Sequence, residues 1–356
     1  MDPADPADPA RAVGAFFDWC AEVPGLGCAV SCCVMRGRPP YQEDRTAVEF
    51  DAGIGALAAV VVDGHGGSAT ADLVGARLCG DVLRARARGE PPGAALRSAI
   101  LQLDRSAMRE RHASDTSGAC LAAALLSADG SLALANLGDC EVLCGFADGR
   151  APAVLSRAHS VDADMPRLRC VRATIERDTP RSESRLVSGG FSLAVARAMG
   201  DFFAKKGDIE SHFEVSREPF VAVAPAGACW LALVSDGTLA GASAKKVATR
   251  ISALSSVLTS RGQRSNVPFF VCAEAILQRR GRDNASCVFF DLRARGALAA
   301  RGDQSDVPAL AQLCETRLAC DPARRDALEA HAVANRPHRR SDGAAGAADD
   351  DVKGTE

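Results

Sequence analysis

Acidic residues recur in this sequence at the ends of short apolar segments. The segment ALAAVVVDGHGG, residues 56–67, runs from apolar residues into Asp63, Gly64 and His65. Apolar runs of this length are typical of buried strands, which would hold the polar residues rigidly at one edge of a sheet. Four further acidic sites flank apolar runs in the same manner: Glu43 with Asp44, Asp139, Asp236, and Asp283 with Asn284.

Carboxylates gathered at one edge of a sheet repel one another and require a counter-charge. Their oxygens suit hard divalent cations such as Mg²⁺ and Mn²⁺, and two cations that share a carboxylate could activate a water molecule as a nucleophile. Gly64 lacks a Cβ, so its carbonyl could approach a metal closely. The imidazole of His65 could act there as a general acid or base. One Asp-Gly pair alone indicates only a turn, but the recurrence favours a metal site.

The surrounding residues predict the elements that would position these acids. Asp129-Gly130 and Asp148-Gly149 predict hairpin turns between apolar runs. Hairpins interleaved with paired helices favour antiparallel sheets covered by helices over parallel βαβ units. The predicted strands include 28–35, 45–50, 219–224, 229–235 and 285–292, and the predicted helices are 68–86, 93–113, 243–259, 268–280 and 306–333.

Composition and charge exclude several classes of partner. The chain has 356 residues, 47% hydrophobic and 24% charged, so it can bury a sizeable core. Its net charge of -3 provides no electrostatic footprint for nucleic acid or an anionic membrane, and no apolar run reaches the length of about 18 residues that spans a membrane. Many of the fourteen cysteines lie in apolar runs, and no paired C-x-x-C motifs indicate zinc. We therefore expect a soluble, reduced monomer of the cytoplasm or nucleus.

The sequence predicts one domain between two polar tails. Residues 1–14, with their repeated DPA triplet, and residues 335–356 are too polar to pack, and we expect both to be disordered. Residues 15–334 would form the domain, with a C-terminal helical extension at 305–334. Residues 157–184 are charged and irregular, which indicates a mobile surface segment.

Six motifs occur in an order that resembles one protein family. They are an ED pair before a strand, DGHGG after the next strand, NLGD, LAVARAMGDFF, VSDG and DNAS. They resemble the metal-dependent Ser/Thr protein phosphatases, the PPM or phosphatase 2C family, and the resemblance covers roughly residues 25–293. The resemblance implies an α+β fold, a four-layer αββα sandwich of two antiparallel β-sheets packed face to face and flanked by helices. It also implies hydrolysis of phosphoserine and phosphothreonine in phosphoprotein substrates.

The resemblance further implies a binuclear Mg²⁺ or Mn²⁺ centre, with two ions per chain. Asp63 would bridge both ions. The carbonyl of Gly64 and the side chain of Glu43 would bind one ion, and Asp236 and Asp283 would bind the other. A water activated by the ions would attack the phosphate directly, without a phosphoenzyme intermediate.

Other residues acquire roles from the same resemblance. Asp139 matches an acid associated with a third, weaker metal ion. Asp44 and Asn284 would orient the metal ligands, and His65 would protonate the departing Ser or Thr oxygen.

Two segments that match the family are expected to be structural. They are Ser117-Gly118, at the start of a predicted strand, and SLAVARAMGD at residues 192–201, which overlaps the fourth motif above. Within these motifs, only Asp201 carries more than a small functional weight.

The sequence departs from the family pattern where phosphate is bound. A phosphate-clamping arginine is usual five residues before the Asp of the ED pair, and this position is Pro39, flanked by Arg36 and Arg38. Arg38 is a candidate replacement, because a guanidinium pairs bidentately with phosphate, and it is equally consistent with a solvated loop charge. Ala240 replaces an acid linked to the third metal, and Glu141 replaces an arginine.

Three functional hypotheses remain open at this point. The retained metal ligands and His65 favour an active phosphatase, because an unpaired carboxylate cluster would only destabilise a fold that does not use it. Pro39 and Ala240 favour a phosphatase-like module that binds a partner and turns over weakly. The third hypothesis is a metal-binding structural domain without phosphate chemistry.

Overall fold

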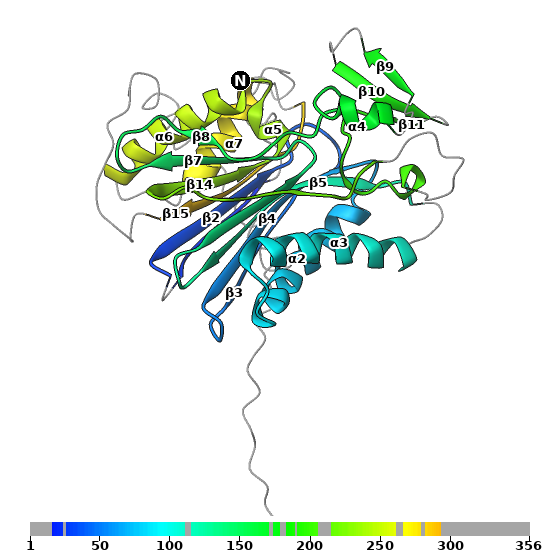
Figure 1. The fold of residues 1–356 in the computed structure, drawn as a ribbon. Helices are drawn as coiled ribbons and strands as arrows, with labels where there is room; N and C mark the ends of the chain where they lie inside the picture. Colours follow the sequence, from blue (N-terminus) through cyan, green and yellow to red (C-terminus); the bar gives the residue numbers. More distant parts are fainter. Residues whose placement is uncertain are drawn as a thin grey trace, which may run out of the picture.

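The computed structural model shows two large β-sheets with helices on their outer faces (Figure 1). It describes residues 16–23, 26–110, 115–170, 174–178, 183–188, 191–205, 215–260, 266–278 and 282–292. The predicted tails and the helical extension at 305–334 lie outside these ranges. Among the helices that the structure describes, none has the length and apolar character needed to cross a membrane.

The first sheet has six strands in the order β13-β6-β5-β4-β3, with β12 paired to β5. Each strand runs antiparallel to its neighbours. The bounds are β3 Arg45–Asp51, β4 Ala56–His65, β5 Gly118–Ser127, β6 Leu132–Leu137, β12 Met199–Gly200 and β13 Phe220–Val223.

The second sheet also has six strands, in the order β1-β2-β15-β14-β7-β8. It too is antiparallel throughout. The bounds are β1 Phe16–Val23, β2 Cys28–Met35, β7 Glu141–Phe146, β8 Ala153–Val154, β14 Ala228–Val234 and β15 Ala285–Asp291.

Three apolar cores separate four layers. One core lies between the sheets and contains Leu57 of the first sheet and Leu233 of the second. A second core joins the first sheet to two helices, α2 and α3, and a third joins the second sheet to α6 and α7. The predicted αββα sandwich is therefore confirmed. The helix bounds are α2 Ala69–Ala87, α3 Pro92–Glu110, α5 Asp236–Leu239, α6 Ala244–Ser260 and α7 Val267–Gln278.

Strand β4 explains how the fold aims its polar end. Successive side chains of a strand point to opposite faces of the sheet. Leu57, Ala59 and Val61 lie in the core between the sheets, whereas the alternate residues lie in the core under the helices. The alternation therefore places Asp63 and His65 on the side that faces the second sheet.

The predicted elements that lie within the described residues are confirmed with small shifts at their ends, and two regions differ. Gly130 and Gly149 have φ values of 88° and 79°, as the predicted hairpin turns require. Strand β1 was not predicted. The segment 157–184, predicted to be irregular, contains a short helix and part of a small sheet: α4 Met165–Cys170, then β9 Ile175–Asp178, β10 Glu183–Ser188 and β11 Phe191–Leu193.

Candidate functional site

The structure brings acids from four separate segments to one end of the sandwich. Asp63 lies near the end of β4, Asp44 precedes β3, Asp139 lies between β6 and β7, and Asp236 begins α5. Burial raises the pKa of Asp63 well above its ordinary value, and the charges of the other three acids raise it further. These carboxylates therefore lie close enough to repel one another in a site poor in water.

Two further pKa shifts report the same repulsion. Burial is the main cause that raises the pKa of Asp44 to about 7; two serine hydroxyls oppose the rise, and the charges of Asp236 and Asp283 add to it. Burial also raises the pKa of Asp139 to about 6, again with a contribution from Asp236. Asp283 acts on Asp44 and so belongs to the same cluster.

The chemistry of this acidic cluster fits divalent cations. All the named interactions that shift the pKa of Asp63 raise it, and Asp44 Oδ2 is buried without a hydrogen-bond partner among the described residues. Oxygen donors with excess negative charge are the ligands that Mg²⁺ and Mn²⁺ take. In the part of the chain that is described, no three His, Cys, Asp or Glu side chains are grouped so that they could hold a metal as they stand. The cluster has the charge and donor atoms of a metal site without a preformed coordination geometry.

Gly64 and Glu43 are held together beside the cluster. A Cβ on Gly64 would lie 2.7 Å from the backbone oxygen of Glu43, which is too close for any other residue type. The N–H of Gly67 donates a hydrogen bond of 2.7 Å to Glu43 Oε1. The DGHGG turn therefore fixes the Glu43 carboxylate next to the end of β4.

Asn284 ties the loop before β3 to the start of β15. Its Oδ1 accepts from the N–H of Glu43 at 2.8 Å, and its Nδ2 donates to the carbonyl oxygens of Arg36 at 2.7 Å and Tyr41 at 3.3 Å. A Cβ on Gly237 would lie 1.7 Å from the backbone carbonyl oxygen of Asn284, so the residue after Asp236 must be glycine. These contacts fit the predicted role of Asn284 in orienting neighbouring ligands.

His65 forms an ion pair with Asp201. The His65 Nε2 atom lies 2.9 Å from Asp201 Oδ2, and the Asp201 side chain is fully buried. Burial by itself would lower the pKa of His65, but the charge and hydrogen bond of Asp201 outweigh it, with help from Asp139 and Glu43, and the net pKa is raised. Asp201 is the one residue of the SLAVARAMGD stretch to which the sequence gives functional weight, but the sequence does not indicate that its partner is His65.

A buried network holds the segment that carries Asp201. Asp104 of α3 accepts hydrogen bonds of 2.9 Å from the N–H of Gly200 and from Lys205 Nζ. The side chains of Asp104 and Lys205 are both fully buried. Arg217 Nε lies 3.0 Å from Oδ2 of Asp104. The sequence alone does not distinguish these charged residues, because the spacing of α3 marks Asp104 only as one polar residue in an amphipathic helix.

Known proteins resemble this chain in sequence and in fold. A family model described as protein phosphatase 2C matches residues 56–250, more than half of the chain. The chain belongs to the protein phosphatase 2C family. The match includes Asp63, His65, Asp139, Asp201 and Asp236.

Relatives of this phosphatase 2C family member come from plants and animals. It is 33% identical over 197 residues to probable protein phosphatase 2C 74 of Oryza sativa subsp. japonica, covering 50% of this chain and 45% of that one. It is 31% identical over 242 residues to probable protein phosphatase 1N of Homo sapiens, covering 64% of this chain and 52% of the relative. The chain thus spans about half the length of these relatives.

Solved structures share the fold at lower identity. A serine-threonine phosphatase 2C from Toxoplasma gondii superimposes with a TM-score of 0.62 at 17% identity, covering 78% of this chain and 99% of the other. A C. elegans sex determining protein gives a TM-score of 0.60 at 22% identity, covering 74% of this chain and 64% of that one. These matches support the sandwich architecture of the family member.

The two arginines that flank Pro39 differ in exposure. Arg38 is exposed. Arg36 is partly buried, its carbonyl is held by Asn284, and its Nε is buried without a hydrogen-bond partner among the described residues. Through its carbonyl, Arg36 belongs to the hydrogen-bond network around Asn284, a connection that its place in the sequence does not indicate.

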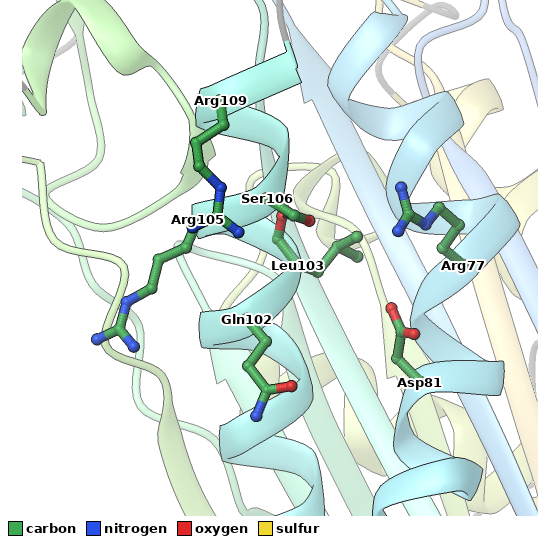
Figure 2. Close-up of a pocket in the computed structure, with 7 residues that line it drawn as sticks. All are labelled: Arg77, Asp81, Gln102, Leu103, Arg105, Ser106 and Arg109. Carbon is green, nitrogen blue, oxygen red and sulfur yellow. Dashed lines mark hydrogen bonds between the residues drawn. The ribbon is translucent and has the colours of Figure 1, made fainter.

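A pocket of about 420 Å³ lies between α2 and α3 (Figure 2). Two of its charged residues are already paired nearby, Arg77 with Glu110 at 3.7 Å and Asp81 with Arg84. None of the predicted site residues of this phosphatase 2C family member lines it, so we assign the pocket no part in the site. The lining residues are Arg77, Asp81, Gln102, Leu103, Arg105, Ser106 and Arg109.

Proposed function

We propose that this chain is a protein serine/threonine phosphatase that hydrolyses phosphoserine and phosphothreonine in protein substrates. The observation that carries the proposal is the buried cluster of Asp44, Asp63, Asp139 and Asp236 in a chain of the phosphatase 2C family. Mutual repulsion of buried carboxylates lowers the stability of a fold. A domain that binds no metal would gain nothing from such a cluster of buried carboxylates.

The acidic cluster would hold two divalent cations. Asp63 would be shared, with Glu43 and the carbonyl of Gly64 on one side and Asp236 and Asp283 on the other. Bound Mg²⁺ or Mn²⁺ would neutralise the carboxylates. It would also lower the pKa of a bound water molecule, which would make that water a nucleophile toward phosphate at neutral pH.

Three other residues support this site in the proposal. Asn284 holds the Glu43 segment in place through the backbone N–H of Glu43. Asp139 is kept as the candidate for a third, weaker cation. His65 would donate a proton to the Ser or Thr oxygen as the phosphorus–oxygen bond breaks, and its raised pKa keeps the imidazole protonated to a higher pH.

Hydrolysis of p-nitrophenyl phosphate and of a phosphothreonine peptide, with Mn²⁺ and with EDTA, tests the function. We expect turnover with Mn²⁺, none with EDTA, and a loss on the order of 1,000-fold in Asp236→Asn, because metal ions contribute several kcal/mol to such reactions. Turnover that survives EDTA would exclude the metal dependence. A folded wild type without turnover would favour the phosphatase-like binding module, to which the departures at Pro39 and Ala240 point.

A pair of arginine variants tests phosphate binding. We expect Arg38→Ala to raise KM for p-nitrophenyl phosphate roughly 10- to 100-fold with little change in kcat, since a charge-assisted contact made equally in the ground and transition states would be lost. Arg36→Ala is the matched comparison. If KM rises only in Arg36→Ala, the contact belongs to Arg36, and Arg38 is a solvated loop charge.

A further inference from the structure

Three adjacent strands bring His65 and Asp201 to the two sides of one glycine. In the pairing of β4 with β5, His65 lies opposite Gly118. On the other side of β5, Gly200 of β12 lies opposite the same Gly118, and Asp201 follows Gly200. Neighbouring strands are about 4.8 Å apart, so β4 and β12 cannot pair directly. Their side chains can still meet above a central residue that has no side chain.

The His65 and Asp201 side chains make close contact across this position. The His65 Nε2 atom lies 2.9 Å from Oδ2 and 3.1 Å from Oδ1 of Asp201. The Asp201 side chain is fully buried, whereas 31% of the His65 side chain is exposed. The pair therefore has an anchored, buried half and an exposed half that a substrate could reach.

A side chain at position 118 would prevent this contact. A Cβ built on Gly118 would lie 2.3 Å from both Asp201 Oδ2 and His65 Nε2, far inside van der Waals distance. Gly118 is not among the described glycines with positive φ. The glycine is therefore required by the meeting of its two neighbours and not by its own backbone conformation.

The backbone of Asp201 is held in an uncommon conformation. Its φ is 46°, in the left-handed region that residues other than glycine seldom occupy. Its N–H donates to the carbonyl of Ser117 at 3.0 Å, and the preceding N–H of Gly200 donates to Asp104 at 2.9 Å. Such over-determined strain clusters at functional sites.

We propose that Asp201 is a positioning residue for His65, an inference that rests on the proposed phosphatase function. With Nε2 held by Asp201, Nδ1 is the nitrogen left to serve the substrate. As the phosphorus–oxygen bond breaks, its electron pair moves to the Ser or Thr oxygen, which takes the Nδ1 proton. The imidazole is left neutral with its remaining proton on Nε2, facing Asp201. Asp201 acts through His65 and does not touch the substrate.

The Asp201→Asn variant tests this role through the leaving group. Asparagine tolerates a left-handed backbone as aspartate does, so the fold should be kept, but the amide has no charge and can present N–H to the imidazole. We expect kcat for a phosphothreonine peptide to fall on the order of 10- to 100-fold at unchanged KM. For p-nitrophenyl phosphate, whose leaving group needs no proton, we expect a loss below about 3-fold. Equal losses on both substrates would overturn the proposal.

Two further variants make the kinetic test more specific. In a His65→Gln background, Asp201→Asn should cause little additional loss on the peptide, because residues that act as a unit are not additive; an independent, multiplying loss would contradict the proposal. Asp164→Asn is the matched control, since Asp164 is a buried carboxylate whose partners are Arg197, at 2.7 Å, and Arg167, at 3.2 Å. It should leave the ratio of the two substrates unchanged.

The ¹⁵N NMR shifts of the His65 ring provide a readout that does not depend on activity. The signal is assigned by its loss in His65→Gln. We expect the wild type to show a proton on Nε2 and Asp201→Asn to change the shifts of both ring nitrogens. Unchanged shifts would overturn the positioning role even in an active phosphatase. Changed shifts in a protein that does not hydrolyse phosphate would retain the positioning of His65 and reject the proposed function.

Discussion

Replacing Asp63 with asparagine is expected to abolish phosphatase activity and to make the metal-free protein more stable. Asp63 is the residue proposed to be shared by both cations, so kcat should fall on the order of 1,000-fold or more. Stability should change in the opposite direction, because the Asp63 carboxylate lies among three other acids that raise its pKa. The variant should therefore separate function from stability at a single position.

The pH dependence follows from the sign of these shifts. The native pKa of Asp44 is about 7 and that of Asp139 about 6, both above the ordinary value of 3.8. Between pH 4 and 7 the folded protein therefore keeps protons on these carboxyl groups that the unfolded chain has released. The free energy of unfolding consequently falls as the pH rises through this range. Removing the Asp63 charge relieves the repulsion, which we expect to add about 1–3 kcal/mol at pH 7.5 and less at pH 5.

Thermal unfolding in EDTA at the two pH values measures this difference. The expected gain corresponds to roughly 2–4 °C per kcal/mol. Mn²⁺ should stabilise the wild type but not Asp63→Asn, because only a protein that binds the ion gains by mass action. Asp148→Asn, which removes an exposed carboxylate paired with Arg150, is the control and should leave the unfolding temperature essentially unchanged. A less stable Asp63→Asn in EDTA would contradict the repulsion.

Replacing Asp104 with alanine is expected to cost about 3–5 kcal/mol of unfolding free energy. Asp104 and Lys205 are both fully buried and lie 2.9 Å apart. Burial lowers the pKa of Lys205, and the charge and hydrogen bond of Asp104 counteract that shift. Alanine would leave a buried ammonium without its partner. It would also remove the acceptor for the N–H of Gly200, so the segment before Asp201 should loosen and peptide turnover should fall.

Urea unfolding of three variants isolates the pair. Asp104→Leu combined with Lys205→Met should recover most of the loss, because apolar residues of similar size replace a buried ion pair at little cost. Arg97→Ala removes a surface ion pair with Glu218 and should cost less than about 1 kcal/mol. A loss below 1 kcal/mol in Asp104→Ala would show that the pair does not hold the segment.

Much of the sandwich follows from local patterns in the sequence. The run Ala56–Val62 is apolar at every position because both faces of β4 are covered, one by the second sheet and one by helices. The hairpin turns at Gly130 and Gly149 need positive φ, which glycine adopts without strain. Strand β1 lacks such a pattern, since FFDWCAEV neither alternates cleanly nor stays apolar, and its place is set by pairing with β2.

The residues of the candidate site likewise include some that the sequence indicates and others that only the structure reveals. Asp63, Asp139 and Asp236 could be found because each follows an apolar run, and strand ends from separate hairpins meet at one edge of the sandwich. Asp201 stood in a motif without an evident role. Its partner His65 is 136 residues away in the chain, and a glycine on a third strand permits their contact.

The sequence by itself determined the layers, the turn positions and the acidic residues that end the strands, because these depend on the period of apolar residues and on the backbone preferences of single residues. The tertiary structure decided which side chains meet: His65 with Asp201, and Asp104 with Lys205. Such contacts depend on strand register and on helix placement, and these are set only when the sheets and helices pack together. The proposed chemistry therefore rests on residue types that the sequence displays, held in place by pairings that only the fold creates.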